Sequence, residues 1–187
     1  MRYYPIMLNI KGKDCIVIGG GVVAERKVLS LLVAGGKITI ISPNITKRLR
    51  QLLKQKKIIY KKRKFQEAFL HNASVVIAAT ANQKVNQEIY HFCQKKKILV
   101  NVVDNPKLSS FIVPAAVARG DLVIAVSTQG KIPMLAKKIK EQLEQIFSHK
   151  YVKITRELAQ KRKDILNSDK NPKAKKKKIA QLIKLMP

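Results

Sequence analysis

The chain has 187 residues and 46% of them are hydrophobic, which is enough for the core of one domain with a small appendage. The 39 basic and 11 acidic residues give a net charge of +28, and because most of the basic residues are lysines rather than arginines, specific nucleic-acid recognition is not expected. No apolar run is long enough to span a membrane and the N-terminus lacks a signal-peptide core, so we expect a cytoplasmic protein with no membrane contact.

The first half of the chain alternates short apolar runs with segments of helical periodicity. Strands are predicted at 14–18, 37–41, 58–60, 74–79 and 98–103, and helices at 22–33, 46–54 and 84–95. The third strand is the most polar and should lie near an edge of the sheet. This alternation predicts an α/β fold, a Rossmann-like doubly wound parallel sheet.

After Pro106 the pattern changes. A β-hairpin is predicted from 111–117 and 122–127 around the turn 119–121, followed by helices at 133–147 and 151–166, a polar Lys-rich break at 167–178 and a short helix at 179–185. We therefore expect three segments: an NAD-binding Rossmann domain (1–113), a hairpin-plus-helix dimerisation segment (114–148) and a helical, Lys-rich tail (149–187).

A glycine-rich turn follows the first predicted strand. Gly19-x-Gly21-x-x-Ala24 matches the G-x-G-x-x-G/A pattern between a strand and a helix. The first glycine permits the tight turn, the second lets backbone amides approach a pyrophosphate, and Ala24 allows close packing of helix on sheet. The turn predicts a nucleotide site formed by Gly19, Gly20, Gly21, Val22, Val23 and Ala24.

The end of the second predicted strand departs from this pattern. An acidic residue usually holds the adenosine ribose there, whereas this chain has Ser42-Pro43. Ser42 can still donate one hydrogen bond, so we place Ser42 and Pro43 in the cofactor site. Lys47 and Arg48 follow shortly after, which leaves NADP open as an alternative, and we favour NAD.

Several further motifs accompany the turn. They are Pro5-Ile6, the run from Val17 to Lys27, Ile77-Ala78-Ala79-Thr80 with Asn86, the run from Asn101 to Pro106, the run from Ser110 to Ala115, and Val126-Ser127-Thr128-Gln129-Gly130 before Pro133. Over about residues 3–150, the chain resembles the precorrin-2 dehydrogenase/sirohydrochlorin ferrochelatase family, the N-terminal module of siroheme synthases. A generic Rossmann enzyme has no reason to carry N-V-V-D-x-P followed by S-F-I-x-P.

The resemblance implies an activity and an assembly. It implies NAD-dependent oxidation of precorrin-2 to sirohydrochlorin, followed in some members by insertion of Fe²⁺, as a substrate, at the same site. It also implies a homodimer joined through the hairpin region. No methyltransferase-like sequence follows, so the chain resembles the stand-alone form. A basic crevice would attract a tetrapyrrole rich in carboxylates.

Asp104 is the residue that we expect to be catalytic. It ends the fifth predicted strand, beside the crevice where such sheets bind ligands. In the family the Asp of this motif serves dehydrogenation and, where present, chelation, and both reactions release protons that a carboxylate can accept. The same carboxylate could contact Fe²⁺ transiently. The residues alone also allow Asp104-Asn105-Pro106 to be only a turn.

The remaining site predictions fall into two groups. On the cofactor side we expect Thr80, Ala81, Asn82 and Val103, with Thr80–Asn82 near the nicotinamide ribose. On the substrate side we expect Asn101, Lys107, Ser110, Phe111, Pro114, Ser127 and Thr128. Ser127 and Thr128 are equally compatible with polar residues that close a strand.

The cysteines and histidines carry no site prediction. Cys15 and Cys93 should be small buried apolar residues, and His71, His91 and His149 should not be ligands, so no preformed metal site is expected. Two other functions remain open: an NAD(H)-binding, redox-sensing regulatory Rossmann protein, and a nucleic-acid-binding protein that uses the positive charge.

Overall fold

The computed structural model describes residues 3–168 and 171–184. It divides the chain into two compact units, residues 1–112 and 113–187. The boundary lies one residue before the predicted end of the Rossmann domain, and the second unit contains both of the other predicted segments.

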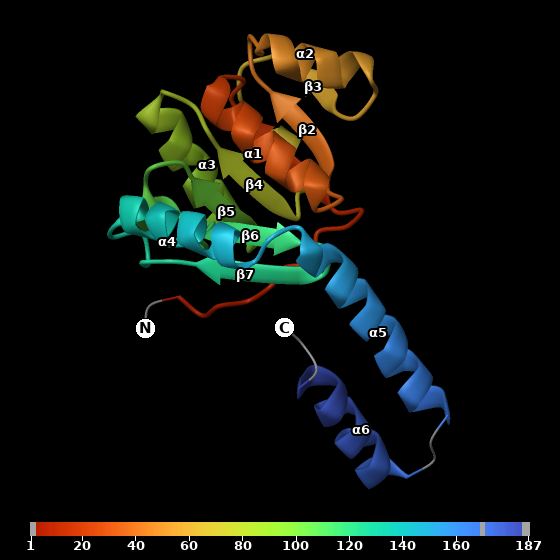
Figure 1. The fold of residues 1–187 in the computed structure, drawn as a ribbon. Coiled ribbons are helices and arrows are strands. Elements are labelled where there is room, and N and C mark those ends of the chain that lie inside the picture. Colours follow the sequence, from red (N-terminus) through yellow and green to blue (C-terminus); the bar gives the residue numbers. More distant parts are fainter. Residues whose placement is uncertain (1–2, 169–170, 185–187) are drawn as a thin grey trace. The chain divides into compact units, whose positions relative to one another are not determined.

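The first unit is built on a parallel sheet of five strands. They are β1 (Asp14–Ile18), β2 (Lys37–Ile41), β3 (Ile59–Lys61), β4 (Val75–Ala78) and β5 (Leu99–Val102), in the order β3-β2-β1-β4-β5 (Figure 1). In register, Val17 of β1 lies between Ile40 of β2 and Ile77 of β4. The order reverses beside β1, as the doubly wound prediction requires, and β3 lies at the edge as expected.

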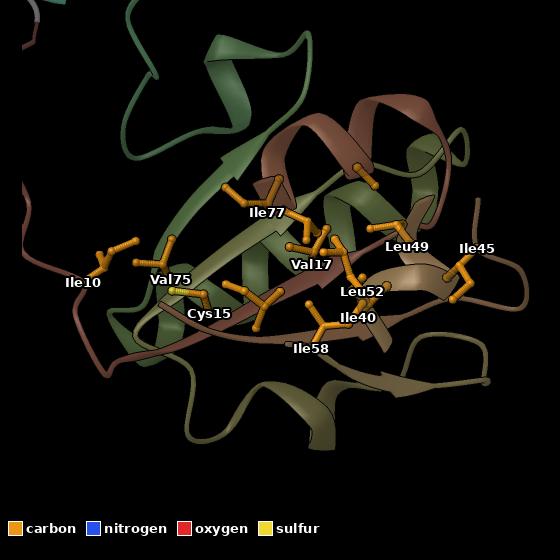
Figure 2. Packing of buried hydrophobic residues seen from close by; sticks show 13 residues of the cluster. Ile10, Cys15, Val17, Ile40, Ile45, Leu49, Leu52, Ile58, Val75 and Ile77 are labelled. Atoms are coloured by element: carbon orange, nitrogen blue, oxygen red, sulfur yellow. The ribbon is translucent and has the colours of Figure 1, made fainter. Parts of the chain in front are cut away.

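Helices cover both faces of this sheet. They are α1 (Val22–Val33), α2 (Lys47–Lys54) and α3 (Gln83–Lys96), with short 3₁₀ turns η1 (Glu67–Leu70) and η2 (Pro106–Leu108) that the sequence did not predict. Successive strand side chains point to opposite faces. Cys15 and Val17 therefore pack with α1 and α2 in the cluster of Figure 2, whereas Ile16 and Ile18 pack with α3.

The second unit begins with an antiparallel hairpin of β6 (Ala115–Arg119) and β7 (Leu122–Val126), with the predicted turn at Gly120. Helix α4 (Pro133–Ile146) packs against both strands and is followed by α5 (Lys150–Ser168) and α6 (Pro172–Lys184). The Nε–H of Arg119 donates to the carbonyl of Phe147 at 2.8 Å, which ties the hairpin to the end of α4.

Two sequence predictions in this part of the chain were wrong. The first hairpin strand begins at Ala115 rather than Phe111, because Phe111 packs on the first unit's core and accepts a hydrogen bond from Asn101 there. The Lys-rich stretch 172–178 is helical rather than a break, since Asn171 accepts from the Lys173 amide at 2.9 Å, Pro172 opens α6, and lysine is a good helix former. The predicted end at 185 lies outside the described residues.

Candidate functional site

A cavity of about 860 Å³ lies at the carboxyl ends of the strands in the first unit. Parallel strands bring the segments that follow them to one edge of the sheet, and the crevice lies where the strand order reverses. Of the twelve residues predicted to bind the cofactor, eleven line it: Gly19, Gly20, Gly21, Val22, Val23, Ser42, Pro43, Thr80, Ala81, Asn82 and Val103. Asp104 lines it as well.

The glycine turn has the conformation that its sequence predicts. Gly19 has φ +118°, and a Cβ there would clash with the carbonyl oxygen of Ala79, so no larger residue fits between β1 and β4. A Cβ on Gly21, in contrast, would meet nothing within 4 Å. The open space beside Gly21 is therefore available to a ligand, and Gly19 is required by the fold itself.

Helix α1 begins directly at this turn, with Gly21 as its N-cap. The first hydrogen bond of the helix runs from the Glu25 amide to the Gly21 carbonyl at 2.9 Å, so the amides of the first turn have no partner within the helix. Ala24 does not line the cavity. It is fully buried between helix and sheet, which is the packing role that the sequence predicted for it.

The loop after β2 is anchored to the edge strand. The Ser42 amide donates to the carbonyl of Lys61 at 3.3 Å, and the Tyr60 hydroxyl donates to the carbonyl of Pro43 at 3.0 Å. Ser42 is itself buried, 8% exposed. This end of the cavity is thus fixed in position and carries a neutral hydroxyl.

The loop after β4 is held by a buried asparagine. The Thr80 hydroxyl donates to Oδ1 of Asn86 at 2.8 Å, and Nδ2 of Asn86 donates back to the Thr80 carbonyl at 3.0 Å. Asn82 caps α3 by accepting from the Val85 amide at 3.2 Å. These bonds keep Thr80–Asn82 in one conformation at the cavity wall.

Asp104 is exposed at the cavity and has φ +58°. Left-handed backbone is uncommon outside glycine, although Asp and Asn tolerate it, and such conformations cluster at functional sites. Burial lowers the pKa of Lys27 on α1, the charge of Arg26 lowers it further, and the carboxylate of Asp104 acts in the opposite direction. The Lys27 ammonium therefore lies within electrostatic reach of Asp104.

Two predicted substrate residues use their polar groups inside the first unit. Nδ2 of the buried Asn101 donates to the Phe111 carbonyl at 3.0 Å. The Ser110 hydroxyl accepts a hydrogen bond from the Val100 amide at 2.8 Å and donates one to the Val100 carbonyl at 3.1 Å. Ser110 thus satisfies backbone groups at the edge of β5 that no neighbouring strand pairs among the described residues. Phe111 is half-buried and Lys107 is exposed. Their contacts with substrate stay predictions.

Pro114, Ser127 and Thr128 belong to the second unit. Pro114 is exposed just before β6. The Ser127 hydroxyl accepts from the Gln129 amide and the Thr128 hydroxyl accepts from the Ile132 amide, both at 3.0 Å. Both hydroxyls therefore shape the loop between β7 and α4, as the strand-closing interpretation expects, and their role toward substrate stays a prediction.

Several residues of the cavity wall were not predicted from the sequence. They are Ile18, Ile41, Arg63, Lys64, Phe65, Ala79, Val85 and Glu88. Arg63, Lys64 and Phe65 follow β3, whose carboxyl end meets the same sheet edge as the other strands. The basic run after the third predicted strand was the signal that could have identified them.

The cysteines lie outside the cavity lining and are fully buried. Burial raises the pKa of the Cys93 thiol to about 12. The pKa of the Cys15 thiol is also raised, mainly by burial and to a smaller extent by the negative charge of Asp14. Among residues 3–168 and 171–184, no three His, Cys, Asp or Glu side chains form a group that could hold a metal ion. No helix in the described part of the chain is long and apolar enough to cross a membrane.

Comparison with known proteins gives two family-model matches. A model described as NAD(P)-binding matches residues 6–115, and one described as the central part of a sirohaem biosynthesis protein matches residues 119–146. The solved structure of "SirC, precorrin-2 dehydrogenase" aligns with a TM-score of 0.83 and 30% identity, over 97% of this chain and 89% of that one.

Curated sequences agree with these matches. Siroheme synthase of Vesicomyosocius okutanii subsp. Calyptogena okutanii (strain HA) is 40% identical over 154 residues, which is 82% of this chain and 33% of that protein. Siroheme synthase of Nitrosococcus oceani is 38% identical over 151 residues, 81% of this chain and 32% of that protein. The chain thus spans about a third of the length of these relatives.

Proposed function

The chain belongs to the precorrin-2 dehydrogenase/sirohydrochlorin ferrochelatase family, and we propose that it oxidises precorrin-2 to sirohydrochlorin with a nicotinamide dinucleotide. One observation carries the proposal: a single cavity joins the glycine turn to Asp104. The similarity to a precorrin-2 dehydrogenase over 97% of the chain supports it.

The cavity fits a dinucleotide at its glycine end. The space beside Gly21 is open, and the amides of the first turn of α1 point toward it with the partial positive charge of a helix N-terminus. Ser42 would contact the adenosine ribose, and Thr80–Asn82 the nicotinamide ribose. The sequence favours NAD as this dinucleotide, and when bound it supplies the hydride acceptor.

Asp104 would accept the proton at its carboxylate. Dehydrogenation removes a hydride and a proton from the tetrapyrrole, so the site needs a base beside the hydride acceptor. Asp104 is exposed at the cavity, and its left-handed backbone conformation sets the direction in which its side chain leaves the main chain. The Lys27 ammonium lies within electrostatic reach of that carboxylate.

Iron insertion would use the same carboxylate. Placing Fe²⁺ in sirohydrochlorin releases two pyrrole protons, and Asp104 could accept protons in that reaction as well. Incubation of purified sirohydrochlorin with Fe²⁺ or Co²⁺ tests this part of the proposal. Insertion faster than the uncatalysed rate supports it, and an unchanged rate limits the activity to dehydrogenation.

We also propose that the chain forms a homodimer through the second unit. One face of the hairpin carries exposed apolar side chains at the strand positions that alternate with those packed on α4. They are Ala116, which pairs with Ala125 across the hairpin, and Ala118, which pairs with Val123. An uncovered apolar sheet face is typical of a protein interface. Cytoplasmic location remains a prediction from the sequence.

The test is an anaerobic reaction of the full chain with precorrin-2 and dinucleotide, followed by the absorbance of reduced dinucleotide and of sirohydrochlorin. We expect both to rise together and neither to rise without the dinucleotide. Dinucleotide binding with no turnover and no quenching of tyrosine fluorescence by the tetrapyrrole would contradict the proposal and favour a redox sensor.

A further inference from the structure

Two cations line the adenosine end of the cavity, and we propose that Arg63 and Lys64 bind the 2′-phosphate of NADP. The chain then binds NADP(H) at least as tightly as NAD(H), which departs from the sequence-based expectation of NAD. The inference deepens the proposed function, because it rests on the dinucleotide entering this cavity, and it requires nothing of the tetrapyrrole chemistry.

The position of the 2′-phosphate follows from the topology. In a Rossmann unit the residue that ends the second strand faces the adenosine ribose, where an acid holds the 2′-hydroxyl of NAD and repels a phosphate. Here that residue is Ser42, which lines the cavity and is neutral. The usual barrier against NADP is therefore missing at this position.

Arg63 and Lys64 are brought to this position by the anchored edge of the sheet. Lys61 accepts hydrogen bonds at its carbonyl from the Ser42 amide at 3.3 Å and from the Arg63 amide at 2.9 Å. One carbonyl thus joins the end of β2 to the loop that carries the two cations. Both cations line the same cavity as Ser42.

The charges of these two side chains are available to a ligand. Arg63 and Lys64 are exposed, and among the described residues neither forms an ion pair with a carboxylate. The acids of the cavity wall are Glu88 on α3 and Asp104 after β5, which belong to the other half of the sheet. The cavity is therefore basic at its β2–β3 end and acidic beside β4 and β5. An arginine fork beside an ammonium is a common phosphate-binding pair.

Lys47 and Arg48, the cations that the sequence suggested for this role, do not line the cavity. Both are exposed on α2, and Arg48 donates to Gln51 of the same helix at 3.4 Å. They form a Lys-Arg pair of the same net charge as Arg63-Lys64. Their removal is therefore a matched control for the general attraction of anions to a chain of charge +28.

The test is calorimetric binding of 2′,5′-ADP and 5′-ADP to the full chain and to two double variants, R63A/K64A and K47A/R48A. We expect the unmodified chain to bind 2′,5′-ADP at least as tightly as 5′-ADP. R63A/K64A should weaken 2′,5′-ADP by about tenfold and 5′-ADP by less than about twofold, because only the phosphate contacts are lost. K47A/R48A should weaken both ligands equally and slightly.

Two outcomes would overturn the inference. One is tighter binding of 5′-ADP than of 2′,5′-ADP by the unmodified chain, and the other is an equal loss for both ligands in R63A/K64A. A chain that binds 2′,5′-ADP as expected but does not oxidise precorrin-2 would contradict the proposed function alone. Thermal melts of both variants show whether the exposed substitutions leave the fold intact.

Discussion

The two units of the chain differ in how completely they bury their apolar residues. Among the described residues, Val117 and Ala136 are the only buried hydrophobic residues of the second unit, and all the others belong to the first. Both units expose large apolar side chains, and those of the second unit are Val113, Val123, Ile132, Met134, Leu135, Ile146, Leu166 and Ile183. The first unit closes its own core, whereas we propose that the second completes its core against a partner surface.

This difference separates two kinds of substitution. In the first unit, the cavity rests on a complete core, so exposed side chains at the cavity can change chemistry without changing stability. In the second unit, the exposed apolar residues should affect assembly more than folding. Substitutions in the two units should therefore differ in whether they change activity, stability or assembly.

Asp104→Asn should lower the rate of precorrin-2 oxidation by about 10²–10⁴-fold, because the amide cannot accept the proton. Asparagine tolerates the left-handed backbone that Asp104 adopts, so the melting temperature should not change. Steady-state rates and thermal melts check both statements. Asp121→Asn in the exposed hairpin removes the same charge and should keep the rate. Normal turnover by Asp104→Asn would exclude Asp104 as the catalytic base.

Gly19→Ala should lower the free energy of unfolding by about 2–4 kcal/mol, since it adds a clash with Ala79 to an unfavourable φ. Gly21→Ala should cost less than about 1 kcal/mol. Its methyl group occupies the phosphate side of the turn, however, and should weaken dinucleotide binding by about tenfold. Urea unfolding and calorimetry measure the pair. Equal destabilisation by both would contradict the assigned roles.

Val123→Lys should weaken the homodimer by at least about tenfold, because dimerisation would then bury a charge. Val123 is 45% exposed in the single chain, so the fold should remain. Analytical ultracentrifugation over a concentration series checks the dissociation constant. The control is Val33→Lys, at an apolar residue of the first unit that is 91% exposed. A dimer unaffected by Val123→Lys would place the interface elsewhere.

The Cys93 thiol should make stability depend on alkaline pH. Its pKa is raised from 9.0 in the unfolded chain to about 12 in the folded one, so its contribution is complete below pH 9 and is lost as the pH rises toward 12. Between pH 8 and pH 10 the unmodified chain should lose about 1 kcal/mol more than Cys93→Ala does. Urea unfolding at the two pH values checks this, and identical losses would contradict it.

Local patterns were sufficient for the strand, turn and helix at the glycine end of the cavity. The run Asp14–Ile18, the turn Gly19–Gly21 and the helix from Val22 each follow from spacing, and together they locate the cavity. Arg63 and Lys64 escaped prediction because their role depends on which strand ends share an edge, and the sheet order is not written in any local pattern. The run from Phe111 was misassigned because it crosses the boundary between the two units, which follows residue 112, and Phe111 packs on the core of the first unit.

The substrate side of the site shows a second limit. Asn101 and Ser110 belong to motifs shared with the family, yet their polar groups bond to Phe111 and to the edge of β5. A motif preserves residues that build a site as well as residues that touch its ligand. Asp104 differs from both, because it lines the cavity and no intrachain hydrogen bond fixes its carboxylate among the described residues.

The most direct test is a single anaerobic turnover of the dinucleotide-loaded chain with limiting precorrin-2. We expect one reduced dinucleotide for each sirohydrochlorin formed, with the rate reduced in Asp104→Asn while both ligands remain bound. Bound dinucleotide and bound tetrapyrrole with no transfer between them, or transfer at the same rate in the variant, would contradict a dehydrogenase site built from the glycine turn and Asp104.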